Sequence, residues 1–532
     1  MNLSLSQIAV AVGGRLIGPD ATVTGPVVTD SRQASPGALF VAVHGERTDG
    51  HAHLGSAGAL GAVGAIVSDL KAARTGLSVE PAEAAESEDL PMGLVLVEDT
   101  VVALGALART HLEGLRRAAA DRGERLTVVA MTGSVGKTTT KDLTRQLLAA
   151  SGPTVAPRAS FNNEIGLPLT ALQVGEETRF LVAEMGASAV GEIAYLTTIA
   201  RPDLAVELKV GVAHLGGFGS VENIRQAKSE LVRALPPSGL AILNENDENI
   251  RLMPEMTGVR NLLWFGLHED RPDEDRSDES ETAYPSVPSA MSAAEIYGDQ
   301  VQVDDQDRPS FTVHFPDGTG CPMSLALPGR HNVMNALAAI CVAYAMDLPT
   351  EAIAGILAHQ GAQSPHRMDI RQVPFRPDSD LAFTLIDDSF NANPDSMKAG
   401  LDGLAAWHAE SRTRDERPYR VAVLGSMLEL GPNEKELHQR MGAYALSVAD
   451  MVIAVGSEEE PHLDELAHDF VLGADHDQKE AGSIHWVHSA EQAADLVRGL
   501  EGEHRQTVVL LKGSHASGLQ GLADYWLGQA RK

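Results

Sequence analysis

Short apolar runs alternate with helix-length amphipathic stretches along most of this chain. LTVVAMTG at residues 126–133, RFLVAEMG at 179–186 and RVAVLGSM at 420–427 are each followed by a helical pattern. Strands separated by helix-length segments are typical of strand-helix-strand units, whose strands pair in parallel. The pattern therefore predicts an α/β fold with parallel sheets, built twice over with an interruption near residues 361–380.

The first hundred residues have a different composition and pattern of apolar residues. They are rich in glycine, contain only short apolar runs and end where a helical pattern begins at residue 101. MNLSLSQIAVAVGG at the start has no basic residue ahead of its apolar ones, so it predicts a short amphipathic helix and not a signal peptide. The expected domains are a small α/β N-terminal domain at 1–100, a central P-loop parallel-sheet domain at 101–362 and a C-terminal Rossmann-like domain at 363–532.

Two segments break this pattern. Residues 71–92 are rich in Ala, Glu and Pro, and residues 268–291 contain EDRPDEDRSDESET. Acidic runs without apolar periodicity are usually solvated loops. We therefore expect a loop at 71–92 and an acidic insertion in the central domain at about 268–291.

Composition narrows the classes of function. The 532 residues include 73 acidic and 42 basic side chains, for a net charge of -31. This charge argues against a protein that binds the phosphate backbone of a nucleic acid. Only two cysteines occur, in keeping with a reducing compartment. The uncharged run at 51–68 is too weakly apolar to span a bilayer. We expect a cytoplasmic protein without integral membrane association.

The stretch VVAMTGSVGKTTTKDLTRQLL at 128–148 has the form of a strand, a glycine turn and a helix. Gly133 and Gly136 permit a tight turn whose amides converge on phosphate oxygens, Lys137 can reach the outer phosphates, and the Thr138 hydroxyl suits Mg²⁺. Met131 stands where the strict motif has its first glycine, so the loop is a shortened form. The candidate nucleotide contacts are Thr132, Gly133, Ser134, Val135, Gly136, Lys137, Thr138 and Thr139.

Further polar residues could carry chemistry, although each has an ordinary alternative. Glu184 ends a strand as a metal ligand would, but such carboxylates also cap helices. His214 in a glycine-rich loop and Lys228 on the next helix could be structural or solvated. The other candidates lie in turns or at a helix start, where local backbone geometry alone can explain them: Asn163, Asn332, Asn335, Arg367 and Asp388.

Taken together and in order, these stretches resemble the Mur ligase family, ATP-dependent enzymes that extend the peptide of peptidoglycan precursors. TDSRQASPGALFVAVHGERTDGH at 29–51, DDSFNANPDSMKAGL at 387–401 and VLGSMLELGPNEKELHQRMG at 423–442 are most similar to the branch that joins D-alanyl-D-alanine to UDP-N-acetylmuramoyl-tripeptide. The Asp-Asn-Pro-Arg stretch of the sibling that adds the third amino acid is absent. The alternatives are a sibling ligase that uses another amine and a P-loop nucleotide hydrolase.

The resemblance implies a catalytic set of Lys137, His214, Lys228 and Arg367. Lys137 and Thr138 would hold the ATP phosphates and a first Mg²⁺, with Glu184 as a further ligand of that ion. His214 would bind a second Mg²⁺. Lys228 matches the lysine that carbon dioxide carbamylates, which turns a cation into an anionic oxygen ligand.

The resemblance also implies the substrate contacts and the reaction. Asn163, Asn332 and Asn335 would contact the nucleotide, and Arg367 and Asp388 would reach it from the C-terminal domain. Ser31 and Arg32 would receive the UDP end of the tripeptide substrate. The tripeptide carboxylate would take the γ-phosphate of ATP to give an acyl phosphate, which the amine then attacks.

We also expect a monomer with a hinge at 361–365, whose closure delivers Arg367 and excludes water from the acyl phosphate. Three positions depart from the family pattern. Lys209 stands where asparagine is common, Val135 fills the variable position of the phosphate loop, and His515 stands where arginine is usual. Lys209 would add positive charge near the phosphates, and His515 lies where the acidic end of the substrate would be held.

Overall fold

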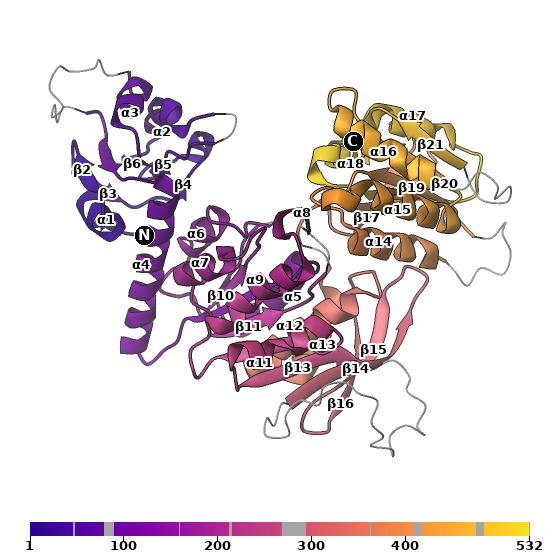
Figure 1. Cartoon of the computed structure of the whole chain (residues 1–532), viewed down its shortest axis with the longest axis horizontal. Helices are drawn as coiled ribbons and strands as arrows, with labels where there is room; N and C mark the ends of the chain where they lie inside the picture. Colours follow the sequence, from indigo (N-terminus) through magenta and orange to yellow (C-terminus); the bar gives the residue numbers. More distant parts are fainter. Residues whose placement is uncertain are drawn as a thin grey trace.

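The computed structural model describes the chain except residues 46–47, 79–89, 159, 212–214, 269–293, 362, 409–416, 475–482 and 531–532. The described residues form sheets of five, nine and six strands and a two-stranded ribbon of β1 (Leu3–Ser4) and β3 (Thr22–Val23). Figure 1 shows three α/β domains that follow one another along the chain. The predicted three-domain α/β fold is confirmed, and the domain limits given above stay a prediction.

The N-terminal sheet has the order β2-β7-β6-β5-β4, with β4 to β7 parallel and β2 antiparallel to β7. The predicted first helix is present as α1 (Leu5–Val12), which begins with a capping box of Ser4 and Gln7. The other elements are β2 (Arg15–Ile17), β4 (Val27–Val28), β5 (Leu39–Val41), α2 (Leu54–Ala59), β6 (Gly64–Val67), α3 (Leu70–Gly76) and β7 (Gly93–Leu96).

The prediction of a loop at 71–92 is wrong for both ends of this segment. Residues 70–76 form α3, whose first amides at Lys71 and Ala72 donate to the side chain of Asp69. Leu90 and Met92 are buried in the core of the N-terminal sheet. Local capping and two apolar residues therefore outweigh the polar composition, and residues 79–89 lie outside the described residues.

A long helix, α4 (Thr100–Asp121), follows the N-terminal sheet. Leu104 and Leu107 of this helix belong to one buried apolar cluster together with Leu5 of α1 and Val128 of the central sheet. The first two domains thus share a continuous core.

The central sheet has the order β16-β15-β14-β13-β12-β11-β8-β10-β9. Its strands pair in parallel from β9 to β14, whereas β14, β15 and β16 form an antiparallel meander that the sequence pattern did not predict. The strands are β8 (Thr127–Thr132), β9 (Thr154–Val155), β10 (Phe180–Glu184), β11 (Leu204–Glu207), β12 (Leu240–Asn244), β13 (Leu262–Leu267), β14 (Ala294–Val303), β15 (Pro309–His314) and β16 (Gly320–Ser324).

Helices cover both faces of this sheet (Figure 1). α12 is buried on nearly every side, which fits its apolar sequence, and it packs against α5. The helices are α5 (Lys137–Ala149), α6 (Gly166–Ala171), α7 (Glu192–Ile199), α8 (Leu215–Phe218), α9 (Val221–Arg233), α10 (Glu248–Arg251), α11 (Met253–Thr257), α12 (Asn332–Ala345) and α13 (Thr350–His359).

The C-terminal sheet has the order β17-β18-β22-β19-β20-β21 and is parallel except for β17. Its elements are β17 (Asp369–Pro374), β18 (Ala382–Asp388), α14 (Pro394–Ala406), β19 (Tyr419–Gly425), α15 (Glu434–Val448), β20 (Met451–Val455), α16 (Pro461–Gly473), β21 (Ser483–Val487), α17 (Ala490–Gly499), β22 (Thr507–Lys512) and α18 (Leu519–Ala530). Among the described residues, no helix is long and apolar enough to cross a membrane.

Candidate functional site

A cavity of about 420 Å³ lies between the central and C-terminal domains. Its walls include the phosphate loop at the carboxyl end of β8, which lies between β10 on one side and β11 on the other. Ligands in open parallel sheets bind at such a switch point. The predicted residues among its lining are Ser134, Val135, Gly136, Lys137, Thr138, Thr139, Glu184, Lys209, Asn332, Asn335, Arg367 and Asp388.

The phosphate loop has the shape that its glycines predict. Gly136 has φ +85° and directly precedes α5, and a Cβ there would lie 2.3 Å from Asn335 Oδ1. Lys137 Nζ donates to Gly133 O at 2.6 Å, and burial lowers the pKa of its ammonium. Thr132 is buried at the end of β8 and does not line the cavity. The loop holds the lysine close to the position where phosphates would lie.

Hydroxyl, carboxylate and amide groups meet beside this loop. Thr138 Oγ1 donates to Glu184 Oε2 at 2.9 Å, and Asn162 Nδ2 donates to Glu184 Oε1 at 2.8 Å. Asn163 instead accepts the Gly166 amide at 2.9 Å and does not line the cavity. The structure therefore places Asn162, the neighbour of the predicted asparagine, at the site.

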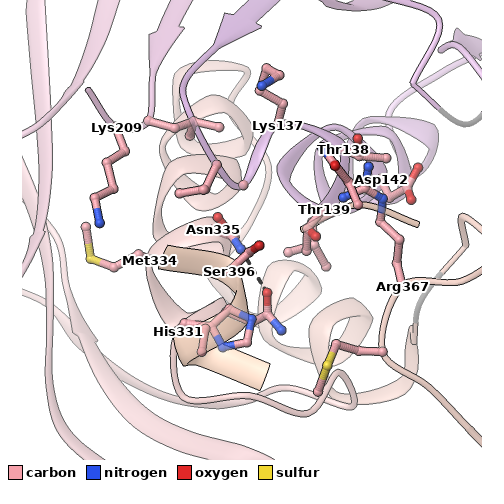
Figure 2. A pocket seen from close by; sticks show the side chains of 18 of the residues that line it. Lys137, Thr138, Thr139, Asp142, Lys209, His331, Met334, Asn335, Arg367 and Ser396 are labelled. Carbon is pink, nitrogen blue, oxygen red and sulfur yellow. Dashed lines mark hydrogen bonds between the residues drawn. The ribbon is translucent and has the colours of Figure 1, made fainter. Parts of the chain in front are cut away.

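The C-terminal domain contributes charged groups to the same cavity. Arg367 lies beside Thr138 in Figure 2. It donates to Ser160 Oγ at 3.0 Å, and its guanidinium lies 4.3 Å from the centre of the Phe390 ring. Asp388 forms an ion pair with the buried Lys512, which sequence analysis missed. Arg367 and Asp388 thus reach the cavity from the C-terminal domain, as predicted.

Asparagines at the start of α12 form the opposite wall. Asn332 Nδ2 donates to Pro328 O at 2.6 Å, and Asn335 Nδ2 donates to Asn332 Oδ1 at 2.8 Å. Lys209 lies on the left of the pocket in Figure 2. Its Nζ is 3.4 Å from Asp395 Oδ1 of α14. Lys209 thus forms an ion pair across the two domains.

A second group of buried polar residues lies behind the loop. Lys228 is only 3% exposed, and burial together with the Lys137 cation lowers its pKa to about 7. Glu207 is fully buried, both carboxylate oxygens lack a hydrogen-bond partner among the described residues, and burial raises its pKa well above its ordinary value. Glu207 was not predicted, and its only sequence signal is an acidic residue inside the apolar stretch LAVELKVG. His214 lies outside the described residues.

The predicted contacts for the UDP end lie on the N-terminal domain, away from this cavity. Ser31 and Arg32 form a 3₁₀ turn capped by Asp30, and the exposed Arg32 guanidinium pairs with that carboxylate at 2.8 Å. His515 in the C-terminal domain is exposed, and its Nδ1 lies 2.8 Å from Gln520 Oε1.

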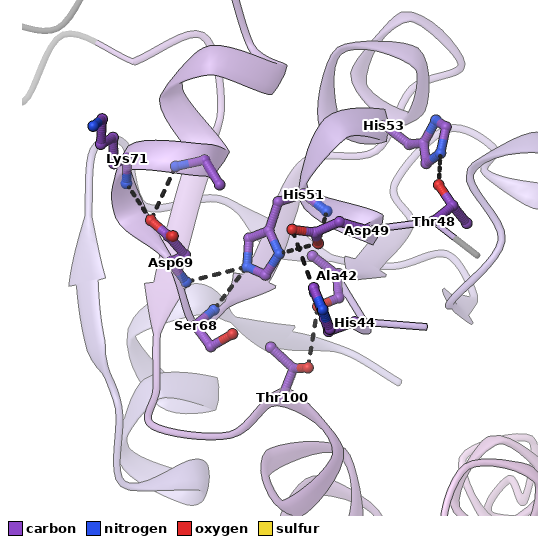
Figure 3. Close-up of polar contacts among 11 residues, drawn as sticks. Ala42, His44, Thr48, Asp49, His51, His53, Ser68, Asp69, Lys71 and Thr100 are labelled. Atoms are coloured by element: carbon purple, nitrogen blue, oxygen red, sulfur yellow. Dashed lines mark hydrogen bonds and ion pairs between the residues drawn. The ribbon is translucent and has the colours of Figure 1, made fainter. Parts of the chain in front are cut away.

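A buried histidine, His51, connects two loops of the N-terminal domain (Figure 3). His51 Nδ1 lies 2.6 Å from Asp49 Oδ1, while its Nε2 accepts the amides of Ser68 at 3.0 Å and Asp69 at 3.2 Å. These contacts fix the loop after β5 against the end of β6.

Comparisons with known proteins bear on this geometry. The Mur ligase middle domain matches residues 131–343, the Mur ligase glutamate ligase domain matches 366–515, and the Mur ligase family catalytic domain matches 26–111. The UDP-N-acetylmuramoyl-tripeptide–D-alanyl-D-alanine ligase of Mycobacterium leprae is 36% identical over 99% of both chains. The chain belongs to the Mur ligase family.

Other Mur ligases agree with this assignment. The enzyme of the same name from Escherichia coli is 32% identical, over 86% of this chain and 87% of its own. The crystal structure of MurF from Acinetobacter baumannii has a TM-score of 0.75 at 27% identity, with 99% of both chains covered. MurF of Thermotoga maritima in complex with ADP has a TM-score of 0.69 at 25% identity, with 96% of this chain and 98% of that chain covered.

Proposed function

We propose that this Mur ligase joins D-alanyl-D-alanine to UDP-N-acetylmuramoyl-tripeptide and converts ATP to ADP and phosphate. The observation that carries the proposal is the cavity between two domains, in which the phosphate loop, Glu184 and Arg367 meet. The names of full-length relatives support the choice of substrates.

The reaction needs positive charge where the γ-phosphate is transferred, because two anions must approach each other. Lys137 follows the glycine turn and Arg367 is brought beside Thr138 through Ser160. The acyl phosphate is a better electrophile than the free carboxylate, so the amine can displace phosphate and form the amide. A cavity closed by the C-terminal domain would shield the acyl phosphate from water.

The donors beside the phosphate loop fit Mg²⁺, since carboxylate and hydroxyl oxygens are the hard ligands that this ion takes. Thr138 and Glu184 would hold the first ion. Their oxygens, Oγ1 and Oε2, lie 2.9 Å apart, so both can contact the same ion. The ion would neutralise phosphate charge. We propose His214 for the second ion from its sequence position alone.

We propose that Lys228 carries a carbamate. Its neutral amine would attack carbon dioxide and release one proton, and the pKa of about 7 supports a sizeable neutral fraction. An anionic oxygen then replaces a cation that would repel metal ions. Protein labelled with ¹³C-bicarbonate should show one carbamate signal that a Lys228→Ala variant lacks, and an unmodified lysine in active, Mg²⁺-loaded enzyme would refute the modification.

At the other end of the substrate, we propose that Ser31 and Arg32 receive the UDP group. We also propose that Asn332, Asn335 and Asp388 contact the nucleotide, together with Asn162 in place of Asn163. The protein would act as a monomer in the cytoplasm, and its free thiols at Cys321 and Cys341 are compatible with a reducing compartment.

A phosphate-release assay tests the proposal. Purified protein receives ATP, Mg²⁺ and UDP-linked tripeptide with lysine or diaminopimelate as third residue, and the amine is varied. We expect release that depends on D-alanyl-D-alanine and a product larger by one dipeptide. Release driven by another amine identifies a sibling ligase, and release without amine identifies a hydrolase, so either result overturns the proposal.

A further inference from the structure

Three side chains with metal-binding atoms meet on adjacent strands of the central sheet. Glu245 follows β12, His268 follows β13, and Glu295 is the second residue of β14. His268 Nε2 lies 2.7 Å from Glu295 Oε1 and 3.5 Å from Glu245 Oε1, and all three donor atoms lie within 4.8 Å of one another. The cluster is separate from the lining of the nucleotide cavity.

The imidazole of His268 is held in a fixed orientation. Its ring stacks on Tyr297 with centroids 4.1 Å apart, and Tyr297 stacks on His314 at 4.6 Å, with interplanar angles of 12° in both pairs. The His268 amide also donates to Gly298 O at 2.9 Å. Rotation of the ring away from the glutamates would break this stack, so Nε2 is already aimed at them.

The electrostatics of the cluster favour a cation. Two carboxylates face one imidazole, so the three side chains carry a net negative charge when the imidazole is neutral, as it must be to bind a metal ion. Arg251 lies 3.7 Å from Glu245 Oε1 but directs its Nε to the Glu245 carbonyl oxygen at 2.5 Å. The side chains of Glu245, His268 and Glu295 are 24%, 39% and 32% exposed, so an ion can reach them from solvent.

We propose that Glu245, His268 and Glu295 bind one divalent transition-metal ion of the zinc class, with water completing the coordination. One nitrogen and two carboxylate oxygens suit Zn²⁺, whereas Mg²⁺ takes oxygen ligands. Ligand atoms of a tetrahedral Zn²⁺ lie about 3.4 Å apart, given metal-ligand distances of about 2.1 Å. The 2.7 and 3.5 Å separations need only small side-chain shifts to reach this value.

The position of the cluster indicates what the ion does. His268 directly precedes residues 269–293, and Glu295 follows them by two positions. An ion bound by both side chains joins the two ends of this acidic segment and ties them to β12 through Glu245. The site is therefore structural, it stabilises the folded protein through binding, and it leaves the ligase reaction unchanged.

Zinc titration of the full-length protein tests this site. The protein is first stripped with EDTA and then titrated by calorimetry in excess Mg²⁺, which fills the sites built from oxygen donors. We expect the wild type to bind one more equivalent of Zn²⁺ than His268→Ala, and Glu295→Gln to bind that equivalent at least tenfold more weakly. His462→Ala removes an exposed histidine that pairs with a glutamate in the C-terminal domain and serves as the matched control.

Two further readouts decide the outcome. Zn²⁺ should raise the melting temperature of the wild type and of His462→Ala, but not that of His268→Ala. Co²⁺ should give visible absorption bands only in proteins that keep the cluster. Circular dichroism and an unchanged ligase rate show that His268→Ala is folded, and equal Zn²⁺ stoichiometry in the folded wild type and variant would overturn the proposal.

Discussion

At the scale of single residues, the phosphate loop depends on one glycine. Gly136 combines a left-handed backbone with a Cβ position only 2.3 Å from Asn335 Oδ1. Any other residue would be strained and would also push against an amide that is bonded to Asn332. The phosphate loop can therefore pack against the start of α12 only because residue 136 has no side chain.

Gly136→Ala should therefore weaken ATP binding. Backbone strain of this kind costs about 1–3 kcal/mol, and each 1.4 kcal/mol is tenfold, so we expect the KM for ATP to rise by about fivefold to a hundredfold. Gly123→Ala is the control, because Gly123 has φ +72° but nothing within 4 Å of its Cβ position. Steady-state kinetics should show the rise only in Gly136→Ala, and an equal KM for ATP in both variants would contradict the steric explanation.

Residues of the site differ in how well the sequence alone could reveal them. Lys137 and Thr138 follow from a local motif, and the resemblance placed Arg367 and Asp388 at the cavity. Lys512 could not be inferred, because it meets Asp388 across 124 positions of the chain and only the pairing of β18 with β22 brings them together. Sequence spacing likewise does not show whether Asn162 or Asn163 faces the cavity. In the structure it is the side chain of Asn162 that points toward Glu184.

At the scale of elements, parallel strands were easier to predict than antiparallel ones. β8 is buried at all six positions, as a strand inside a parallel sheet should be, and its apolar run marks it clearly. β14 is half exposed and carries a register shift between Asp299 and Gln302, so its pattern is weak. α3 was missed because one capping aspartate, Asp69, determines where it begins.

The helix α4 offers a prediction about packing. Leu107 is fully buried in the core shared by the first two domains, whereas Val102 on the same helix is 55% exposed. We expect Leu107→Ala to lower the free energy of unfolding by about 2–5 kcal/mol, and Val102→Ala to change it by about 0.5 kcal/mol at most. Thermal and urea melting measure both. Similar losses in the two variants would show that the shared core contributes little.

At the scale of the whole molecule, the link between the central and C-terminal domains lies against the phosphate-loop helix. The Ser364 amide donates to Asp142 Oδ2 at 3.1 Å, and Arg145 of the same helix donates to Gln363 Oε1 at 3.2 Å. The next residues, His366 and Met368, have positive φ angles of 58° and 51°. Because Gln363 and Ser364 are anchored to the central domain, a pivot between the domains would lie directly after them, at the end of the predicted hinge at 361–365, which stays a prediction.

Binding of both substrates should compact the protein. We expect the radius of gyration from small-angle scattering to fall when a non-hydrolysable ATP analogue and UDP-linked tripeptide are added together, since closure brings Arg367 onto the phosphates. Arg367→Ala should compact less because it lacks the guanidinium that would pair with the phosphates in the closed form. Scattering curves that stay the same with both ligands would contradict a closing hinge.

The core that joins the first two domains limits how Mur ligases can be recombined. A chimera that takes its N-terminal domain from a relative and is joined at residue 100 would pair a foreign α1 with the native Leu104 and Leu107. Mismatched packing there would disturb β8, from which the phosphate loop emerges. A crossover placed after α4, at residues 122–125, would instead transfer α1 and α4 together, leaving β8 as the surface to be matched.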